Sequence, residues 1–206
     1  MTETKDWQRA RRPEQKEERS AAILNAAAVL LDARGINGTS LNAIARAVGL
    51  SKANLYRYFE SREAMLLELM LREQAAWADE LSELLEPLAG KDDLDGVADI
   101  TVSTLAERSR LCVLVAALGG VLEHNVSLEA VIDFKRKCLG LTQEVAAPIA
   151  AALPIRVEQA SQLITMTIIT ASGAWPLCHP SEVAVQALEL PELAPLKLDL
   201  DRKSVV

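Results

Sequence analysis

Apolar residues recur every three or four positions over most of this chain, which is the spacing of one face of an α-helix. An early helix is expected over residues 17–33, with a second after Ser40 and a third after Ser51. Both serines have the side chain of a helix N-cap. Gly49 separates the second and third helices and tolerates the left-handed backbone of a tight turn. Two short helices joined by such a turn form the helix-turn-helix pattern.

The rest of the chain also has helical periodicity. A fourth helix is expected after Ser61, ending before Pro87. Further helices are expected over residues 94–107, 110–123, 128–152 and 156–172, with a short one within 181–190. The Gly119-Gly120 pair and Pro148 each predict a kink, and Gly173 is expected to end the eighth helix. No strand pattern stands out, so the prediction is an all-α fold of about nine helices.

The outward face of the third helix has side chains suited to nucleic acid. Lys52, Tyr56 and Arg57 share this face, opposite the apolar Leu55. Basic and hydroxyl side chains suit phosphates, and Arg also suits guanine edges. No Asp or Glu occurs over residues 33–59, whereas four basic residues do. An acid-free surface is what phosphate contact requires, because each carboxylate would repel the DNA backbone.

This stretch resembles the DNA-binding domain of the TetR/AcrR family of bacterial transcriptional regulators. The residues that carry the resemblance are Thr39-Ser40, Ile44-Ala45, Val48-Gly49-Leu50-Ser51, Leu55-Tyr56-Arg57-Tyr58-Phe59 and Ser61-Arg62-Glu63. The resemblance covers roughly residues 19–69. Arg62 stands where the family usually carries Lys. Ala53-Asn54 replaces a pair that is often Gly-Thr in the family, so the operator sequence stays open.

The expected DNA contacts combine this resemblance with side-chain chemistry. Asn54 and Arg57 are expected to read bases, because Asn pairs with adenine and Arg with guanine. The phosphate contacts are expected from Ser40, Tyr56, Tyr58 and Arg62. The full set expected at DNA is Ser40, Asn42, Ser51, Lys52, Ala53, Asn54, Tyr56, Arg57, Tyr58 and Arg62.

Charge divides the chain into two parts. The net charge is −7, yet residues 1–65 hold 11 basic and 8 acidic residues, while residues 66–206 hold 11 and 21. A basic head on an acidic body is expected of a DNA-reading module joined to a part that does not touch DNA. The expected organisation is an arm at 1–18, a DNA-binding head at 19–65 and an effector-binding, dimerising body at 66–206. The arm fits either a solvated tail or a minor-groove contact.

The resemblance implies that the body binds a small effector and forms a dimer. Met and aromatic residues of the body suit an apolar cavity, although plain core packing is the alternative for each. The effector candidates are Met70, Trp77, Leu118, His124, Phe134, Met166 and Trp175. A stripe on the eighth helix, with two residues of the seventh, is expected to form a two-fold interface. Its residues are Val145, Ile149, Ala160, Leu163, Ile164, Thr167, Ile168 and Ala171.

Other chemistries have little support in the sequence. His124 and His179 lie in no catalytic motif, and the three cysteines are far apart and form no CxxC pair. The cysteines are expected to be packed thiols in a reducing cytoplasm. The longest strongly apolar run, residues 111–122, is too short to span a bilayer. No enzymatic activity, cofactor or metal is therefore expected.

The sequence predicts a transcriptional repressor. It would bind a palindromic DNA operator as a homodimer and be released by a small, largely apolar effector. Two alternatives belong to other classes. One is a small-molecule-binding helical protein whose head serves a protein partner, and the acid-free basic face argues against it. The other is a helical enzyme, for which the sequence offers no paired acid and base.

Overall fold

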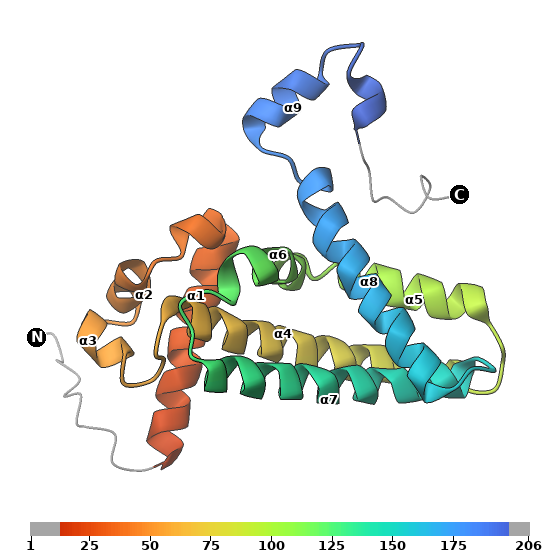
Figure 1. Ribbon diagram of the computed structural model, residues 1–206, viewed down its shortest axis with the longest axis horizontal. Helices are drawn as coiled ribbons and strands as arrows, with labels where there is room; N and C mark the ends of the chain where they lie inside the picture. Colours follow the sequence, from red (N-terminus) through yellow and green to blue (C-terminus); the bar gives the residue numbers. More distant parts are fainter. Residues whose placement is uncertain (1–12, 198–206) are drawn as a thin grey trace, which may run out of the picture.

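The protein folds as helices throughout the part that the computed structural model describes, residues 13–197, and no strand occurs there (Figure 1). The predicted all-α class is therefore confirmed. Nine α-helices lie in this part: α1 (Pro13–Gly38), α2 (Leu41–Ala47), α3 (Lys52–Leu55), α4 (Arg62–Leu85), α5 (Leu94–Ala106), α6 (Ser109–Ala117), α7 (Leu128–Ala152), α8 (Val157–Cys178) and α9 (Glu182–Leu188). Two 3-10 turns, η1 (Glu86–Leu88) and η3 (Ala194–Leu196), and a π turn, η2 (Leu118–Leu122), complete it.

The head is formed by α1, α2, α3 and the first turns of α4. Its core is aliphatic: Ile23 of α1, Ile44 of α2, Leu55 of α3 and Leu66 of α4 are each 1% exposed or less. Burial of such side chains contributes about 1.5–3 kcal/mol each. Because α4 supplies this core at its beginning and continues into the body, head and body share one helix (Figure 1).

The first helix begins earlier than the sequence indicated. The arm was expected to reach residue 18, but α1 starts at Pro13, so residues 13–18 are helical; residues 1–12 lie outside the described part. Proline suits the first turn of a helix, and Glu14 there interacts favourably with the helix dipole. The helical backbone is interrupted at Gly35 (φ 64°), as expected from its position after the predicted helix.

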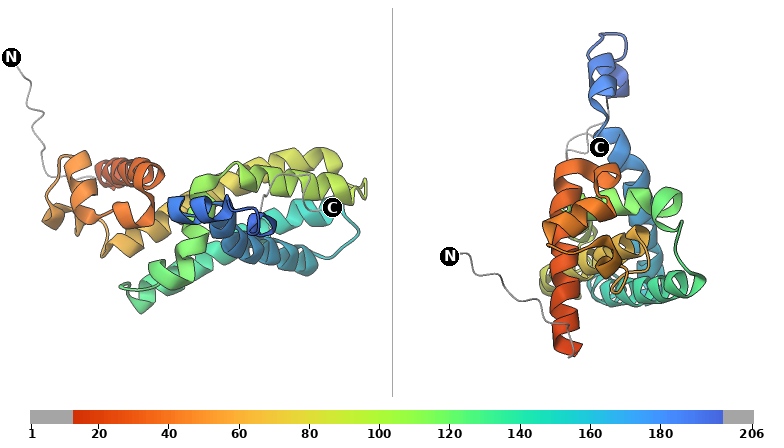
Figure 2. Two further views of the ribbon diagram at one scale, coloured as in Figure 1. Left: turned by 90° about the horizontal axis from the view of Figure 1, so that it is seen from above. Right: turned by 90° about the vertical axis from the view of Figure 1, so that its left-hand side faces the viewer.

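The body is a bundle built on α4 and α7, which run side by side (Figures 1 and 2). α5 packs on α4, and α6 packs on α4, α5 and α8. α8 crosses α7, and the buried Ile149 of α7 and Ile164 of α8 belong to one continuous core. This core also reaches the head through the buried apolar face of α4.

One of the two irregularities expected in the body is found in the structure. The helix before Gly119-Gly120 gives way to the π turn η2, so the break expected there is found. α7 has the expected bounds and includes Pro148, where the expected kink stays a prediction.

The last helices differ from the prediction at one end. α8 was expected to stop at Gly173 but continues through Pro176 to Cys178. A glycine inside a helix costs only about 1 kcal/mol, and the buried Trp175 secures the extra turn. The Trp175 ring stacks on His179, with 3.8 Å between ring centroids. The short α9 lies within the expected range, with Ser181 as its N-cap.

Candidate DNA-binding face and body pockets

The helix-turn-helix geometry follows from local capping signals. The Ser40 hydroxyl accepts a hydrogen bond from the Ala43 N–H at 3.2 Å, and Ser51 accepts one from the Asn54 N–H at 3.2 Å. Between the helices, Gly49 has φ 66°. The Leu50 N–H donates to the Ala45 carbonyl at 2.9 Å, which closes α2 with a Schellman-type turn. These bonds set the angle at which α3 follows α2.

Most residues expected at DNA lie on an exposed surface of α2 and α3. The exposed members are Ser40, Asn42, Ser51, Lys52, Ala53, Asn54, Tyr56 and Arg57. α3 itself is one turn long, but Phe59 N–H still donates to the Leu55 carbonyl at 3.1 Å. Leu55 and Phe59 are both buried, so they anchor this segment from the inner side. The side chains on the opposite side therefore face solvent together.

Tyr58 and Arg62 are placed differently from the other expected contacts. Tyr58 is half-buried and packs against the core. Arg62 is also half-buried, and its Nε donates to Glu63 Oε1 at 3.0 Å. Both residues border the joint between head and body.

Two further residues of this region were not among the expected contacts. Arg46 is exposed on α2, and its Nε donates to the Asn42 carbonyl at 3.4 Å, so its charge lies near the expected contacts. Its membership in the acid-free stretch was the available signal. Thr39 is fully buried and donates to the Gly35 carbonyl at 2.9 Å, which ties the end of α1 to the start of α2.

The carboxylates that border the acid-free stretch are all engaged in hydrogen bonds. Asp32 accepts two hydrogen bonds from Arg110 of α6. Glu60 accepts the Ser127 N–H at 2.7 Å, at the start of α7. Glu63 is paired with Arg62. The negative charges nearest in sequence are thus bound by the body or by Arg62 at the start of α4, and the exposed face of α2 and α3 has only basic and neutral groups.

The residues expected to bind an effector do not form one cavity. Met70, Trp77 and Phe134 are buried in the core, and the Trp77 Nε1–H donates to Thr104 Oγ1 at 3.0 Å. That bond satisfies the indole, so Trp77 is a packed core residue. Met166 is 60% exposed on the outer side of α8. The remaining candidates, Leu118, His124 and Trp175, lie on η2, after η2 and near the end of α8.

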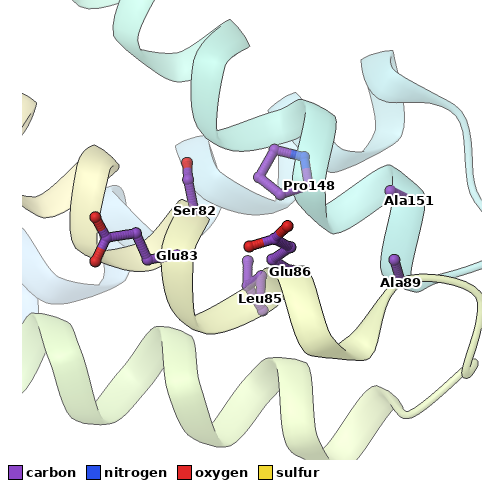
Figure 3. Close-up of a pocket in the computed structure, with 7 residues that line it drawn as sticks. All are labelled: Ser82, Glu83, Leu85, Glu86, Ala89, Pro148 and Ala151. Carbon is purple, nitrogen blue, oxygen red and sulfur yellow. The ribbon is translucent and has the colours of Figure 1, made fainter.

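Two hollows are present in the described part of the chain. One, of about 370 Å³, lies at the far end of the body, where Figure 3 shows Pro148 and Ala151 of α7 opposite Leu85 and Glu86. The second, of about 400 Å³, lies between head and body, and we call it the head–body cleft. Its lining includes Tyr58, Phe59, Glu60, Glu68, Asp133 and Phe134. Phe134 is the one effector candidate that reaches either hollow.

The structure corrects half of the predicted dimer interface. Val145, Ile149, Ala160 and Ile164 are each 2% exposed or less, because α7 and α8 turn them into the core of their own protomer. Thr167, Ile168 and Ala171 are half-buried, and the last two pack against the same core. Leu163 is 50% exposed. The periodicity had identified the inward face of α8.

Cysteine and metal chemistry have no evident place in this part of the chain. Cys112 and Cys138 form no disulfide, and burial raises the pKa of each thiol to about 11. A raised pKa disfavours the reactive thiolate. Over residues 13–197, no three His, Cys, Asp or Glu side chains gather as metal ligands. In the same residues, no single helix has the length and hydropathy of a membrane span, although α7 and α8, bent by 117°, pass that test as a pair.

Two family models match the chain and together cover most of it. Residues 23–69 match the model described as "Bacterial regulatory proteins, tetR family". Residues 71–204 match the model described as "Tetracyclin repressor-like, C-terminal domain". The first match contains the helix-turn-helix, and the second contains the body.

Two curated relatives share part of the sequence. The chain is 40% identical over 86 residues to the uncharacterized HTH-type transcriptional regulator Rv1255c of Mycobacterium tuberculosis, a match covering 40% of this chain and 41% of the relative. It is 28% identical over 124 residues to the HTH-type transcriptional regulator UidR of Escherichia coli, covering 60% of this chain and 61% of UidR. The chain thus spans less than two thirds of the length of either relative.

Solved structures share the fold. The fatty acid degradation regulator FadR from Bacillus halodurans superposes with a TM-score of 0.55 at 15% identity, over 85% of this chain and 94% of that one. A TetR-family transcriptional regulator from Streptomyces coelicolor gives a TM-score of 0.50 at 22% identity, over 88% and 96%. At such identities the likeness concerns the architecture.

Proposed function

Because this chain belongs to the tetR family of bacterial regulatory proteins, we propose that it is a DNA-binding transcriptional regulator. It binds a palindromic operator as a homodimer in the cytoplasm, represses transcription and leaves the operator when a small molecule binds. The observation that carries the proposal is the exposed, acid-free face of α2 and α3. Lys52, Asn54 and Arg57 are all exposed on it, and these side-chain types supply phosphate and base contacts.

The division of roles on this face follows from side-chain chemistry. Asn54 and Arg57 read base edges, whereas Ser40, Lys52 and Tyr56 hold phosphates. Lys52 Nζ lies 5.9 Å from the centroid of the Tyr56 ring, which is the distance of a cation–π contact. The ammonium and the phenol hydroxyl can therefore approach phosphates from adjacent positions. Tyr58 and Arg62 act at the edge of the interface, since both are half-buried.

The dimer interface that the structure favours is the outer face of α8. Leu163, Met166, Thr170, Gly173 and Leu177 are all exposed and follow one another at spacings of three and four residues. That spacing forms the seam of a helix pair. A side chain added at Gly173 would meet no atom of its own chain within 4 Å, so this position allows close approach by a second helix. A two-fold pair of α8 helices presents two heads to a palindromic site.

α9 gives additional support to association along this side of the molecule. It has no buried residue, and Val183 is 76% exposed. Figures 1 and 2 show α9 extending away from the bundle beyond the end of α8. Apolar residues on a short helix outside the bundle gain burial when a second copy packs there.

The test is selection of bound sequences from random double-stranded DNA, followed by gel shifts at several salt concentrations. A palindromic consensus is expected, with affinity that falls steeply as salt increases, because phosphate contacts release counterions. Transcription from a promoter that carries the selected site should decrease when the protein is added. Failure to enrich any sequence above the starting pool, at low salt, would refute the proposed function.

A further inference from the structure

The head–body cleft combines aromatic rings with carboxylates. Phe59 and Phe134 are buried and Tyr58 is half-buried, so these rings give the cleft an apolar surface. Glu60, Glu68 and Asp133 line the same space. The volume of about 400 Å³ lies within the range of small-molecule sites, about 300–1,000 Å³.

The described side chains that line the cleft include three carboxylates and no basic group. Lys137 Nζ lies 2.9 Å from Asp133 Oδ2 and 3.7 Å from Glu68 Oε2, so one ammonium is shared between two carboxylates. These groups raise the pKa of Lys137, chiefly through the hydrogen bond with Asp133. The third carboxylate, Glu60, accepts a neutral backbone N–H from Ser127. The lining therefore has an excess of negative charge.

A lysine ammonium lies near the ring of Phe134, one of the residues that line the cleft. The Lys135 ammonium lies 5.7 Å from the centroid of the Phe134 ring, within the distance of a cation–π contact. Lys135 also pairs with Glu123, which does not line the cleft. Because Lys135 and Glu123 have opposite charges, this ion pair does not change the excess negative charge of the cleft lining.

We propose that the head–body cleft binds a small amphipathic cation: an amine or quaternary ammonium that carries an aromatic or short aliphatic group. Its ammonium would be attracted to the carboxylates, and its apolar part would cover the aromatic rings. An anion would be repelled. A neutral apolar ligand would remove water from the carboxylates without adding a positive charge, which costs free energy. The ligand class therefore differs from the largely apolar effector that the sequence suggested.

The position of the cleft gives the ligand a regulatory role, and this part of the inference rests on the proposed function. Tyr58, Phe59 and Glu60 follow α3 directly, whereas Asp133 and Phe134 belong to α7. A bound cation contacts the DNA-reading unit and the body at once. Its effect on DNA affinity equals its differential affinity for the free and DNA-bound conformations. A change of about 5–150-fold is expected for such coupling.

The binding step is tested on the full chain without DNA. Benzyltrimethylammonium, benzyl alcohol and benzoate are titrated by isothermal calorimetry at neutral pH. The cation is expected to bind at least tenfold more tightly than the alcohol, and benzoate more weakly than either. The double variant Glu68→Gln/Asp133→Asn should remove the preference for the cation. Both side chains are largely exposed, at 47% and 64%, so the variant retains its core.

A matched control removes the same charge elsewhere. Glu83 and Glu86 lie beside the other hollow, at the far end of α4 (Figure 3). The variant Glu83→Gln/Glu86→Gln should bind the cation as the unchanged protein does. Equal affinity for cation and alcohol, or an equal loss in both double variants, would overturn the assignment of the cleft.

The regulatory step is measured separately, by gel shift on the selected operator with and without the cation. If the protein binds DNA but does not bind the cation, the proposed ligand of the cleft is refuted and the proposed function is retained. If the protein binds the cation but does not bind DNA, the proposed function is refuted and the cleft is retained as a cation site. Binding of both with no mutual effect would retain the cleft as a site and refute its regulatory role.

Discussion

The guanidinium of Arg110, at the start of α6, forms a bidentate pair with the carboxylate of Asp32 in α1. Nε lies 3.0 Å from Oδ1, and Nη2 lies 2.6 Å from Oδ2. The remaining terminal nitrogen, Nη1, donates to Glu73 of α4 at 2.8 Å. One body side chain thus holds both the last turns of α1 and the helix shared by head and body. The carboxylates raise the pKa of Arg110, with the Asp32 hydrogen bond as the largest cause.

This network should stabilise the attachment of the head. Asp32→Asn is expected to lower the free energy of unfolding by about 0.5–1 kcal/mol, a modest value because Asp32 is 46% exposed. The loss should shrink at high salt, since salt screens ion pairs at the surface. Urea denaturation at two salt concentrations measures it. Glu192→Gln, which removes the same charge from the exposed turn after α9, is the control and should change nothing measurable.

The two kinds of DNA contact should respond differently to substitution. Asn54→Ala or Arg57→Ala should cost about 1–3 kcal/mol on the selected site and relax the preference at one base position. Lys52→Ala should weaken binding to all sequences alike and reduce the salt slope by about 1. Competition gel shifts with single-base variants of the site separate these effects. Lys91→Ala removes the same charge from the exposed turn before α5 and should leave DNA binding intact. Equal loss of base preference in all three head variants would refute this division of roles.

The outer and inner faces of α8 should give distinct mutant phenotypes. Met166→Glu places a charge on the exposed face and should yield folded monomers, because a dimer would bury that charge without a partner. Ile164→Glu, two residues away, introduces the same charge at a position that is 2% exposed and should unfold the protomer. Sedimentation and circular dichroism distinguish the two results. A dimer that survives Met166→Glu would require another interface.

The turn between α2 and α3 should be sensitive to its backbone conformation alone. At Gly49 the φ angle is 66°, and an added Cβ would meet no atom within 4 Å. Gly49→Ala should therefore destabilise the protein by about 1–2 kcal/mol through the left-handed backbone. Gly140→Ala in α7 has equal space at a helical position and should stabilise the protein by about 0.5–1 kcal/mol. Thermal unfolding of both variants is the measurement, and shifts of the same sign would contradict this account.

The head was predictable because its signals are local. Ser40, Ser51 and Ser61 are found as N-caps, and Gly49 has the expected positive φ. A cap depends on a few adjacent residues, so it can be read without knowing the packing. The start of α1 was placed too late because Glu14 and the acidic residues after it were assigned to a polar arm. The same charges favour the first turns of a helix.

The body could be predicted as helices but not as a set of surfaces. Periodicity shows that one face of α8 is apolar, yet it does not show whether that face meets the same chain or a second one. α8 has apolar residues on two faces: Ile164 is buried, whereas Leu163 and Met166 are exposed. The end of α8 was missed for a related reason. Gly173 and Pro176 are local stop signals, and the packing of Trp175 overrides them.

The unbroken course of α4 sets a geometric scale for regulation. Its 24 residues extend about 36 Å at 1.5 Å per residue. If the body end of such a rod is held and the rod tilts by about 5°, its other end moves by about 3 Å, close to the rise of one base pair. The start of α4 follows the DNA-reading turn after a few residues, so that turn moves with it. In a two-fold dimer both heads shift by this amount. A tilt of a few degrees, which leaves the bundle packed, can therefore change the spacing of the two heads so that it no longer matches the spacing of the two half-sites on DNA.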